Sequence, residues 1–370
     1  METSTFFESV PLNDSDSTSV HSSASVNLGA SATSPTLNFD VLDYLMRIMN
    51  RRSLLRMLRT CRTLYASGIP ILLGAPIVPS ARNIKGFCHF ILADQERCGA
   101  LIRDLMLSNC YRDTECTNDL IRILGVSIGL RRLHMSHLSS LSLSAPTVLA
   151  TAITLPNVHK LELSGIDCLT QPFLERATIL ANHLKLFHSS LAFSSPLTEL
   201  SIHRACLHTL AVWKFEFGGP GVAPFPHLRE LRMEDINYED LSAERLVYVF
   251  PNLTKLSIDS LSQHDLPRHR ELRLANQQAQ RRMSWKELIH VEGTLRALHA
   301  LGLMCPIRCL KPLISDTNWE LGETTNEILQ TVISDCRPTA LEVTVGNLDD
   351  LQKLLQMHPH KPYLTHLSLA

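Results

Sequence analysis

The residues Gly125-Val126-Ser127-Ile128-Gly129 match the GxSxG pattern that surrounds the nucleophilic serine of many hydrolases. In those enzymes the serine lies on a tight turn that follows a buried strand and precedes a helix. Here segment 119–124 has the apolar spacing of a helix, and segment 130–135 reads as a strand. Because this order is reversed, we expect a helix end and no catalytic residue. A serine hydrolase that uses Ser127 is the least favoured alternative.

Histidine and cysteine are the other residues that could support chemistry, with 17 and 10 copies in the chain. His134 and His137 lie close in sequence but have no obvious Cys, Asp or Glu at metal-ligand spacing. Cys305 and Cys309 are four residues apart, and the chain has no CxxC pair. We therefore expect no metal site and no cofactor. In a reducing compartment the cysteines read as small buried apolar residues.

Composition narrows the class of protein. The chain has 370 residues, of which 45% are hydrophobic, and its 35 basic and 36 acidic residues give a net charge of −1. A nucleic-acid-binding protein would usually show a basic excess. No run of 18 apolar residues predicts a membrane span, and the first basic residue, Arg47, comes too late for a secretory signal. We expect a cytoplasmic or nuclear protein that binds neither nucleic acid nor membrane.

A leucine motif, apolar-x-x-Leu-x-apolar, recurs from about residue 100 to the end of the chain. The last two positions of each copy alternate between two faces, which predicts a short strand. A strand with a helical or irregular return cannot bury its own apolar face, but stacked units can. The motif therefore predicts an α/β solenoid of parallel strands. Its copies are Ile102-Leu105-Leu107, Leu130-Leu133-Met135, Val158-Leu161-Leu163, Leu197-Leu200-Ile202, Leu228-Leu231-Met233, Leu253-Leu256-Ile258, Leu298-Leu301-Leu303, Leu341-Val343 and Leu364-Leu367-Leu369.

The chain divides into three regions by composition. Residues 1–35 are rich in Ser and Thr and contain no Lys or Arg, so we expect a disordered leader. Residues 36–75 have the apolar spacing of three short helices. Residues 76–370 form the predicted solenoid, with an arginine-rich insertion at 262–292 that we expect to be exposed.

Cap and breaker residues set the expected ends of the three helices. Asn38 or Asp40 is the candidate cap of the first helix, and Ser53 of the second. We expect Gly68 and Pro70 to end the third.

Segment 36–75 resembles an F-box of the variant common in fungal proteins. The resemblance rests on Leu37, Asp40-Val41-Leu42, Leu54-Leu55, the run Thr60-Cys61-Arg62-Thr63-Leu64-Tyr65 and Ile69-Pro70. The repeat region resembles an irregular leucine-rich-repeat array. The chain departs from these families at two places. Asn38 stands where the F-box usually has Pro, and the ladder of Asn residues that regular repeats carry after the anchor leucine is missing.

The resemblance implies a non-catalytic adaptor of an SCF-type, cullin-RING ubiquitin ligase. The F-box would dock onto a Skp-type adaptor, which joins it to a cullin scaffold, and the repeats would bind a protein substrate. The adaptor-binding residues implied are Leu37, Val41, Leu42, Leu45, Leu54, Leu55, Leu58, Cys61, Arg62, Leu64 and Tyr65.

Six arginines in 16 residues accompany that apolar set and would attract an acidic partner. They are Arg47, Arg51, Arg52, Arg56, Arg59 and Arg62. The alternative is that the three helices only cap the first repeat, with the arginines solvated.

Polar residues occupy the strand positions between the leucines and are expected to face away from the apolar side. Such a mixed strip is typical of a surface that binds protein, although solvated residues without a ligand would give the same pattern. A leucine-rich-repeat interaction scaffold unrelated to ubiquitin is therefore the main alternative function. The expected substrate-binding strip comprises Lys160, Glu162, Glu199, Ser201, Glu230, Arg232, Glu234, Lys255, Ser257 and Asp259.

Overall fold

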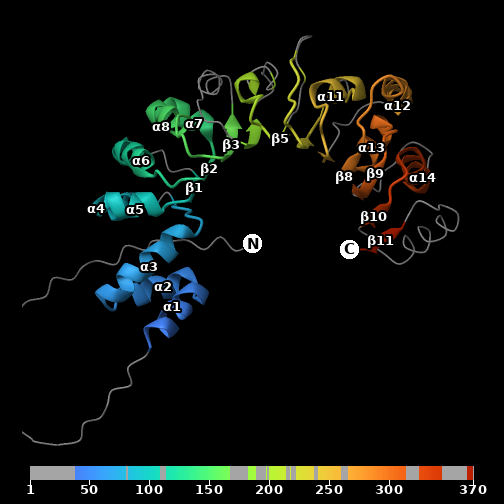
Figure 1. Cartoon of the computed structure of the whole chain (residues 1–370). Helices are drawn as coiled ribbons and strands as arrows, with labels where there is room; N and C mark the ends of the chain where they lie inside the picture. The colour runs from blue at the N-terminus through green and yellow to red at the C-terminus, as the bar shows by residue number, and fades with distance from the viewer. Residues whose placement is uncertain are drawn as a thin grey trace, which may run out of the picture. The chain divides into compact units, whose positions relative to one another are not determined.

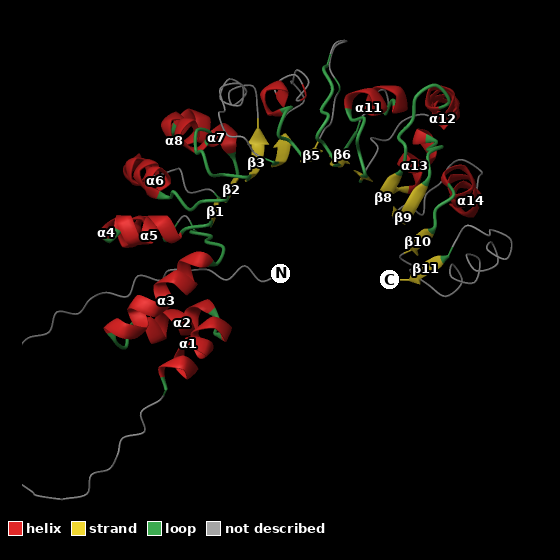
Figure 2. Ribbon diagram, viewed as in Figure 1, coloured by secondary structure: helices red, strands yellow, loops and turns green. Residues whose placement is uncertain are grey.

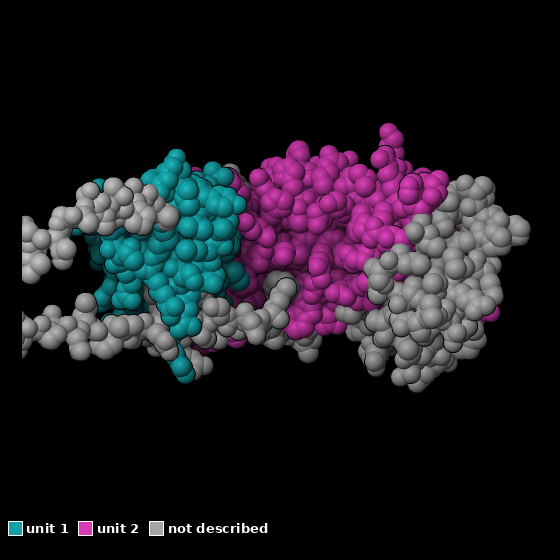
Figure 3. Space-filling view, turned by 90° about the horizontal axis from the view of Figure 1, so that it is seen from below, with its two compact units in different colours: residues 1–131 teal, residues 132–370 magenta. Residues whose placement is uncertain are grey.

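The computed structural model divides into two compact units, residues 1–131 and 132–370 (Figure 3). The expected leader, 1–35, and Leu37 lie outside the described residues. The residues that the structure describes are 38–80, 82–108, 114–166, 182–188, 197, 200–213, 217, 222–236, 241–259, 266–313, 325–343 and 365–369.

The first unit begins with the three expected helices, α1 (Phe39–Ile48), α2 (Arg51–Leu58) and α3 (Arg62–Gly74) (Figure 1). The Asn38 side chain accepts a hydrogen bond from the Asp40 amide and caps α1, as expected. The cap of α2 is Asn50, which accepts from the amide of Ser53, so the expectation that Ser53 itself is the cap is wrong. The asparagine side chain fills the role because it reaches the free amides of the first turn.

Helix α3 continues through Gly68 and Pro70, which we expected to end it. A Cβ on Gly68 would clash with Leu58 Cδ2, so the glycine at this position permits the close approach of α3 to α2. Proline removes the hydrogen bond that would reach the carbonyl four residues earlier. That carbonyl, on Ala66, accepts instead from the guanidinium of Arg97 at 2.7 Å. A partner from α5 (Gln95–Leu101) thus compensates for the proline.

The remainder of the first unit is a second helical group around a short strand. It contains α4 (Ile84–Ala93), α5, β1 (Asp104–Leu107) and α6 (Thr114–Val126). Helices α4, α5 and α6 contact one another, with Phe87 and Ile123 fully buried among them. Ile77 pairs in parallel with Leu105 of β1.

The second unit is built on ten parallel strands whose order in the sheet follows their order in the sequence. This confirms the expected α/β class with parallel strands and helical returns. The strands are β2 (Arg132–Met135), β3 (Lys160–Ile166), β4 (His183–His188), β5 (Thr209–Trp213), β6 (Glu230–Glu234), β7 (Lys255–Ile258), β8 (Leu288–Thr294), β9 (Ile307–Leu313), β10 (Ala340–Val343) and β11 (His366–Leu369).

The described helices cover one face of this sheet, and we call the other, on which none of these helices lies, the open face (Figure 2). The anchor residues align in register across the strands in one ladder, and from β2 to β10 their side chains are buried and form a continuous apolar core against the helices. The ladder runs Leu133, Leu161, Leu184, Leu210, Leu231, Leu256, Val291, Leu310, Leu341 and Leu367. The helices described in this unit are α7 (Leu138–Ser144), α8 (Pro146–Ala152), α11 (Ala243–Val249), α12 (Leu266–Gln280), α13 (Leu295–Leu301) and α14 (Thr325–Cys336).

Two copies of the leucine motif are not strands. Leu200 begins a 3-10 turn, η1 (Leu200–His203), and the copy at Leu298 lies in α13. A spacing of three between leucines also places them on one face of a helix, so the motif alone does not separate the two structures. The strands β4, β5, β8 and β9 lie around these copies and were not predicted.

Threonine hydroxyls join neighbouring repeats at the entry to three strands. Thr254 donates to the carbonyl of Arg229 at 2.9 Å, and Thr339 donates to that of Arg308 at 2.8 Å. Thr365 donates to the carbonyl of Thr339 at 2.9 Å. Each threonine precedes a strand and donates to a carbonyl at, or one residue before, the start of the preceding strand. Successive repeats are therefore joined by hydroxyl groups at these turns.

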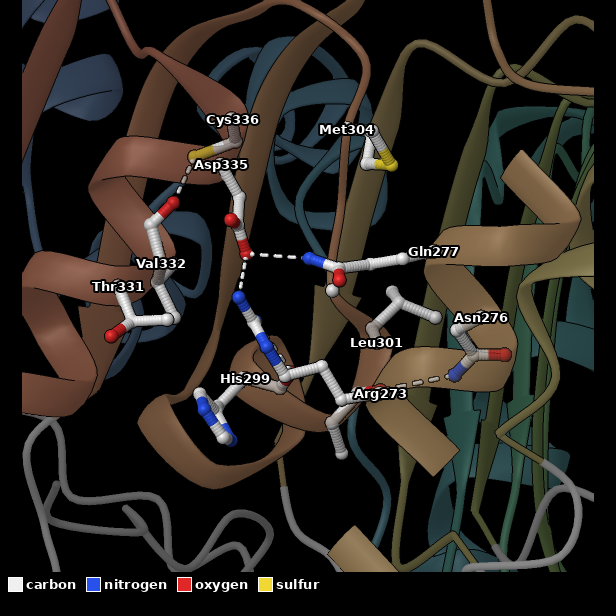
Figure 4. Close-up of polar contacts among 12 residues, drawn as sticks. Arg273, Asn276, Gln277, His299, Leu301, Met304, Thr331, Val332, Asp335 and Cys336 are labelled. Carbon is white, nitrogen blue, oxygen red and sulfur yellow. Dashed lines mark hydrogen bonds and ion pairs between the residues drawn. The ribbon is translucent and has the colours of Figure 1, made fainter. Parts of the chain in front are cut away.

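The segment expected as an exposed insertion, 262–292, contains α12 and the beginning of β8. Helix α12 contacts both α11 and α13 and belongs to the helical layer. Arg273 and Gln277 reach from α12 to the carboxylate of Asp335 on α14 (Figure 4). Its arginines therefore do not form one exposed basic patch, because Arg273 is largely buried in this ion pair.

Asn276 and Gln280 of α12 hold neighbouring backbone segments together. The Asn276 side chain accepts from the amide of Ala243 at 2.8 Å and donates to the carbonyls of Leu241 and Ala300. Gln280 similarly bonds backbone groups at 301–304. Because both side chains are buried, each satisfies polar groups that water does not reach.

Candidate functional site

One apolar face of α1 is exposed to solvent. Val41, Tyr44 and Ile48 follow three- and four-residue steps, so they share one side of the helix. Their exposed fractions are 45%, 64% and 62%. We call these three residues the α1 face. A contiguous group of large exposed apolar side chains is typical of a surface that binds a partner.

The structure sorts the expected adaptor-binding residues into three groups by exposure. Val41, Cys61, Arg62 and Tyr65 are exposed, and Leu42, Leu45 and Leu55 are partly buried. By contrast, Leu54, Leu58 and Leu64 are buried between the helices and stabilise the three-helix group itself. Sequence analysis missed Tyr44 and Ile48 as surface residues, although the helical step from Val41 could have identified them.

The six arginines also separate by role. Arg51 donates to the carbonyls of Pro76 and Leu72, and burial lowers its pKa. Arg47 forms an ion pair with Asp43 at 2.9 Å. The other four, Arg52, Arg56, Arg59 and Arg62, are exposed and form a positively charged part of the helical surface. Such a surface favours an acidic partner.

The open face of the sheet carries the second candidate surface. We define the polar strip as the residues of β2–β10, together with Asp259 directly after β7, that alternate with the leucine ladder and point away from it. The structure brings together eight of the ten residues expected there. Glu199 lies outside the described residues, and Ser201 lies in η1 and not on a strand, so its assignment to the strip is wrong. The cause is the same as for Leu200: the spacing of three in the leucine motif suits a helix as well as a strand.

Glu162 is at the centre of a charged cluster at one end of the strip. Its carboxylate lies 2.9 Å from Lys160 Nζ, 3.5 Å from Lys185 Nζ and 3.3 Å from His134 Nδ1. Desolvation pushes the pKa of Glu162 up, but the hydrogen bond from Lys160, the charge of Lys185 and the contact with His134 together hold it below its usual value. Glu162 is therefore ionised at neutral pH.

A second set of ion pairs lies on the middle strands. Arg232 contacts Glu234 at 2.8 Å and Asp259 at 3.3 Å, so it joins β6 to the end of β7. Lys255 lies 3.7 Å from Glu230 on the neighbouring strand. These contacts order the side chains without burying them, and each contributes little to stability.

The strip continues over β8, β9 and β10 with residues that sequence analysis did not include. Lys311 contacts Glu292 at 2.7 Å, and the Cys309 thiol lies 3.4 Å from Glu342. Burial, together with the hydrogen bond and charge of Glu342, raises the pKa of Cys309 to about 11. The thiol is therefore protonated at neutral pH and a poor nucleophile. The alternation of each strand would have indicated these positions once β8 and β9 were recognised.

Ser127 has the environment of a helix-capping residue. It follows α6, is buried, and its hydroxyl donates to the carbonyl of Ile123 at 2.6 Å. The hydrolase arrangement would require the serine to follow a strand and be accessible to substrate.

In the part of the chain that the structure describes, no three His, Cys, Asp or Glu side chains gather closely enough to hold a metal ion. Among the described helices, none has both the length and the apolar character needed to cross a membrane.

No protein-family model matches this chain, and no curated protein matches its sequence. The α1 face and the polar strip are therefore interpreted from their own chemistry. Both are candidate binding surfaces, since each presents exposed side chains that a protein partner could contact.

Proposed function

We propose that the protein is a non-catalytic substrate-recruiting adaptor of an SCF-type, cullin-RING ubiquitin ligase. In this proposal helices α1–α3 form an F-box-like module that docks onto a Skp-type adaptor, and through it onto a cullin scaffold. The sheet of the second unit, read as an irregular leucine-rich-repeat array, binds the protein substrate through the polar strip. The observation that carries the proposal is the exposed α1 face within a three-helix group that also displays four exposed arginines besides Arg47, which pairs with Asp43.

The physical basis of docking is the combination of apolar area and charge. Burying Val41, Tyr44 and Ile48 against a partner would contribute roughly 1.5–3 kcal/mol for each fully buried aliphatic side chain. The exposed arginines would raise the association rate with an acidic partner and disfavour a basic one. A helical cap that only shields the neighbouring repeat would have no need of exposed apolar residues on its outer helix.

Removal of the exposed apolar side chains tests this proposal. The variant Tyr44→Ala/Ile48→Ala keeps the buried core of the helical group, so it should fold like the wild type. We expect the wild type to retain a purified Skp-type adaptor in a pulldown and the double variant to lose at least tenfold in affinity.

The matched control is Leu143→Ala, which removes an apolar side chain of the second unit that is 73% exposed. It should bind the adaptor like the wild type. A wild-type chain that never retains the adaptor, while its second unit still captures protein, would contradict the ubiquitin connection and favour the interaction scaffold.

A further inference from the structure

The charges of the polar strip are unevenly distributed along the sheet. Strands β2, β3 and β4 present three cations, Arg132, Lys160 and Lys185, against one acid, Glu162. This end of the strip therefore carries an excess of positive charge.

The other end of the strip has the opposite excess. Strands β6 to β10, with the residue that follows β7, present five acids against three cations. The acids are Glu230, Glu234, Asp259, Glu292 and Glu342, and the cations are Arg232, Lys255 and Lys311.

An uncharged strand separates the two ends. The strip residues of β5 are Thr209, Ala211 and Trp213, and they pair in register with residues of β4 and β6. Trp213 is partly buried at the end of the strand. Tryptophan is enriched among the residues that dominate binding energy at protein interfaces. The middle of the strip therefore offers an aromatic contact between regions of opposite charge.

The sign change limits what the strip can bind. A nucleic acid or an anionic membrane surface is negatively charged throughout, so it would be attracted by β2–β4 and repelled by β6–β10. A polypeptide can carry acidic residues at one end and basic residues at the other, and so complement both. Neighbouring strands lie about 4.8 Å apart, so the distance from β3 to β9 is about 29 Å. An extended chain of about nine residues covers that distance.

We propose that the polar strip binds an extended polypeptide segment with acidic residues over β2–β4, an apolar side chain at Trp213 and basic residues over β6–β10. The proposal deepens the recruitment function and rests on it, because it names the class of substrate that the second unit would select. It does not depend on the α1 face.

Synthetic peptides of about twelve residues test the proposal, with fluorescence anisotropy and the full-length chain. One probe has an acidic third, an apolar third and a basic third, and a second has the reverse order. A third probe has the same composition with acidic and basic residues alternating. We expect one of the first two to bind at least tenfold more tightly than the alternating peptide, with affinity falling as salt is raised.

Variants of the chain locate the binding. Lys160→Gln/Lys185→Gln should weaken binding of the tighter peptide about tenfold, and Trp213→Ala should weaken it by a similar factor. The matched control is Arg281→Gln/Arg282→Gln, which removes two exposed cations after α12 and should leave binding unchanged.

Three results would overturn the proposal. They are failure of both ordered peptides to bind, equal binding of the alternating peptide, and equal loss in the control variant. Retention of the Skp-type adaptor is measured on the same proteins. If an ordered peptide binds but the chain does not retain the adaptor, the result supports this proposal and contradicts the recruitment function. If the chain retains the adaptor but binds neither ordered peptide, the result supports the recruitment function and overturns this proposal.

Discussion

At the scale of single residues, Glu162 shows how a side chain on an open sheet face obtains its charge state. Three neighbours on β2, β3 and β4 stabilise its ionised form, and they outweigh the desolvation that opposes it. A carboxyl whose pKa is lowered on folding contributes stability that is present above the pKa of the unfolded chain. That contribution is lost as the pH falls through the folded pKa.

Glu162→Gln should therefore destabilise the protein in a pH-dependent way. We expect a loss of about 0.5–1 kcal/mol at pH 7, because the lysine partners are still partly exposed to solvent. The difference from the wild type should shrink as the pH falls below the usual glutamate pKa of about 4.3, and it should disappear only below the lowered folded pKa, where the wild-type carboxyl is also protonated. Urea unfolding at several pH values measures it. A difference that stays constant from neutral to acidic pH would contradict the ionic origin of the effect.

At the scale of elements, α12 has a role that its composition conceals. Its arginines and glutamines suggest a solvated helix, yet Asn276 and Gln280 bond backbone groups inside the helical layer. Polar side chains at these positions satisfy backbone groups at the turns. An asparagine ladder has this role in a regular leucine-rich-repeat array. The helix is therefore part of the framework of the second unit.

Asn276→Ala should cost about 3 kcal/mol of unfolding free energy, because it leaves a buried amide and two carbonyls without their partner. The exposed neighbour Gln278→Ala should stay within about 0.5 kcal/mol of the wild type. Chemical denaturation of both variants gives the comparison. Equal effects at the two positions would show that the buried contacts of Asn276 contribute little.

The elements also show how far sequence can predict this structure. Strong apolar periodicity identified α1, α2 and α3 and most leucine-motif strands, because one face of each is buried. The motif failed at Leu200 and Leu298, where a spacing of three suits a helix equally well. Leu207-x-x-Leu210-x-Val212 matches the motif fully and is β5, so that strand was open to prediction.

The candidate surfaces were harder to predict than the fold. Composition indicated the arginines of the helical group, but the roles of Arg51 and Arg47 depend on contacts with Pro76, Leu72 and Asp43. Likewise, predicting the charge segregation along the strip would have required the register of β8 and β9, which no local sequence pattern had revealed.

At the scale of the whole molecule, the second unit is organised as a chain of neighbouring strands. In the second unit each strand pairs only with the strands before and after it. Stability in such an array is close to a sum of repeat and neighbour contributions. Damage at one strand should therefore remain local.

Leu210→Ala tests this locality, since Leu210 is fully buried in the leucine ladder. We expect a loss of about 2–5 kcal/mol from the transfer and cavity costs. Amide hydrogen exchange should accelerate in β4, β5 and β6 and change little in β9 and β10. Leu143→Ala, at an exposed site, provides the comparison. Uniform acceleration across all strands would instead indicate a single cooperative unit.

The agreement between strand order and chain order has a consequence for how such a protein can grow. Each strand pairs with the strand synthesised just before it, so a nascent chain can add strands to the sheet one at a time during synthesis. The apolar ladder places nearly the same side chain at every step. A duplicated or deleted strand–helix pair would therefore meet compatible neighbours on both sides, and the gene can change in length while the protein still folds.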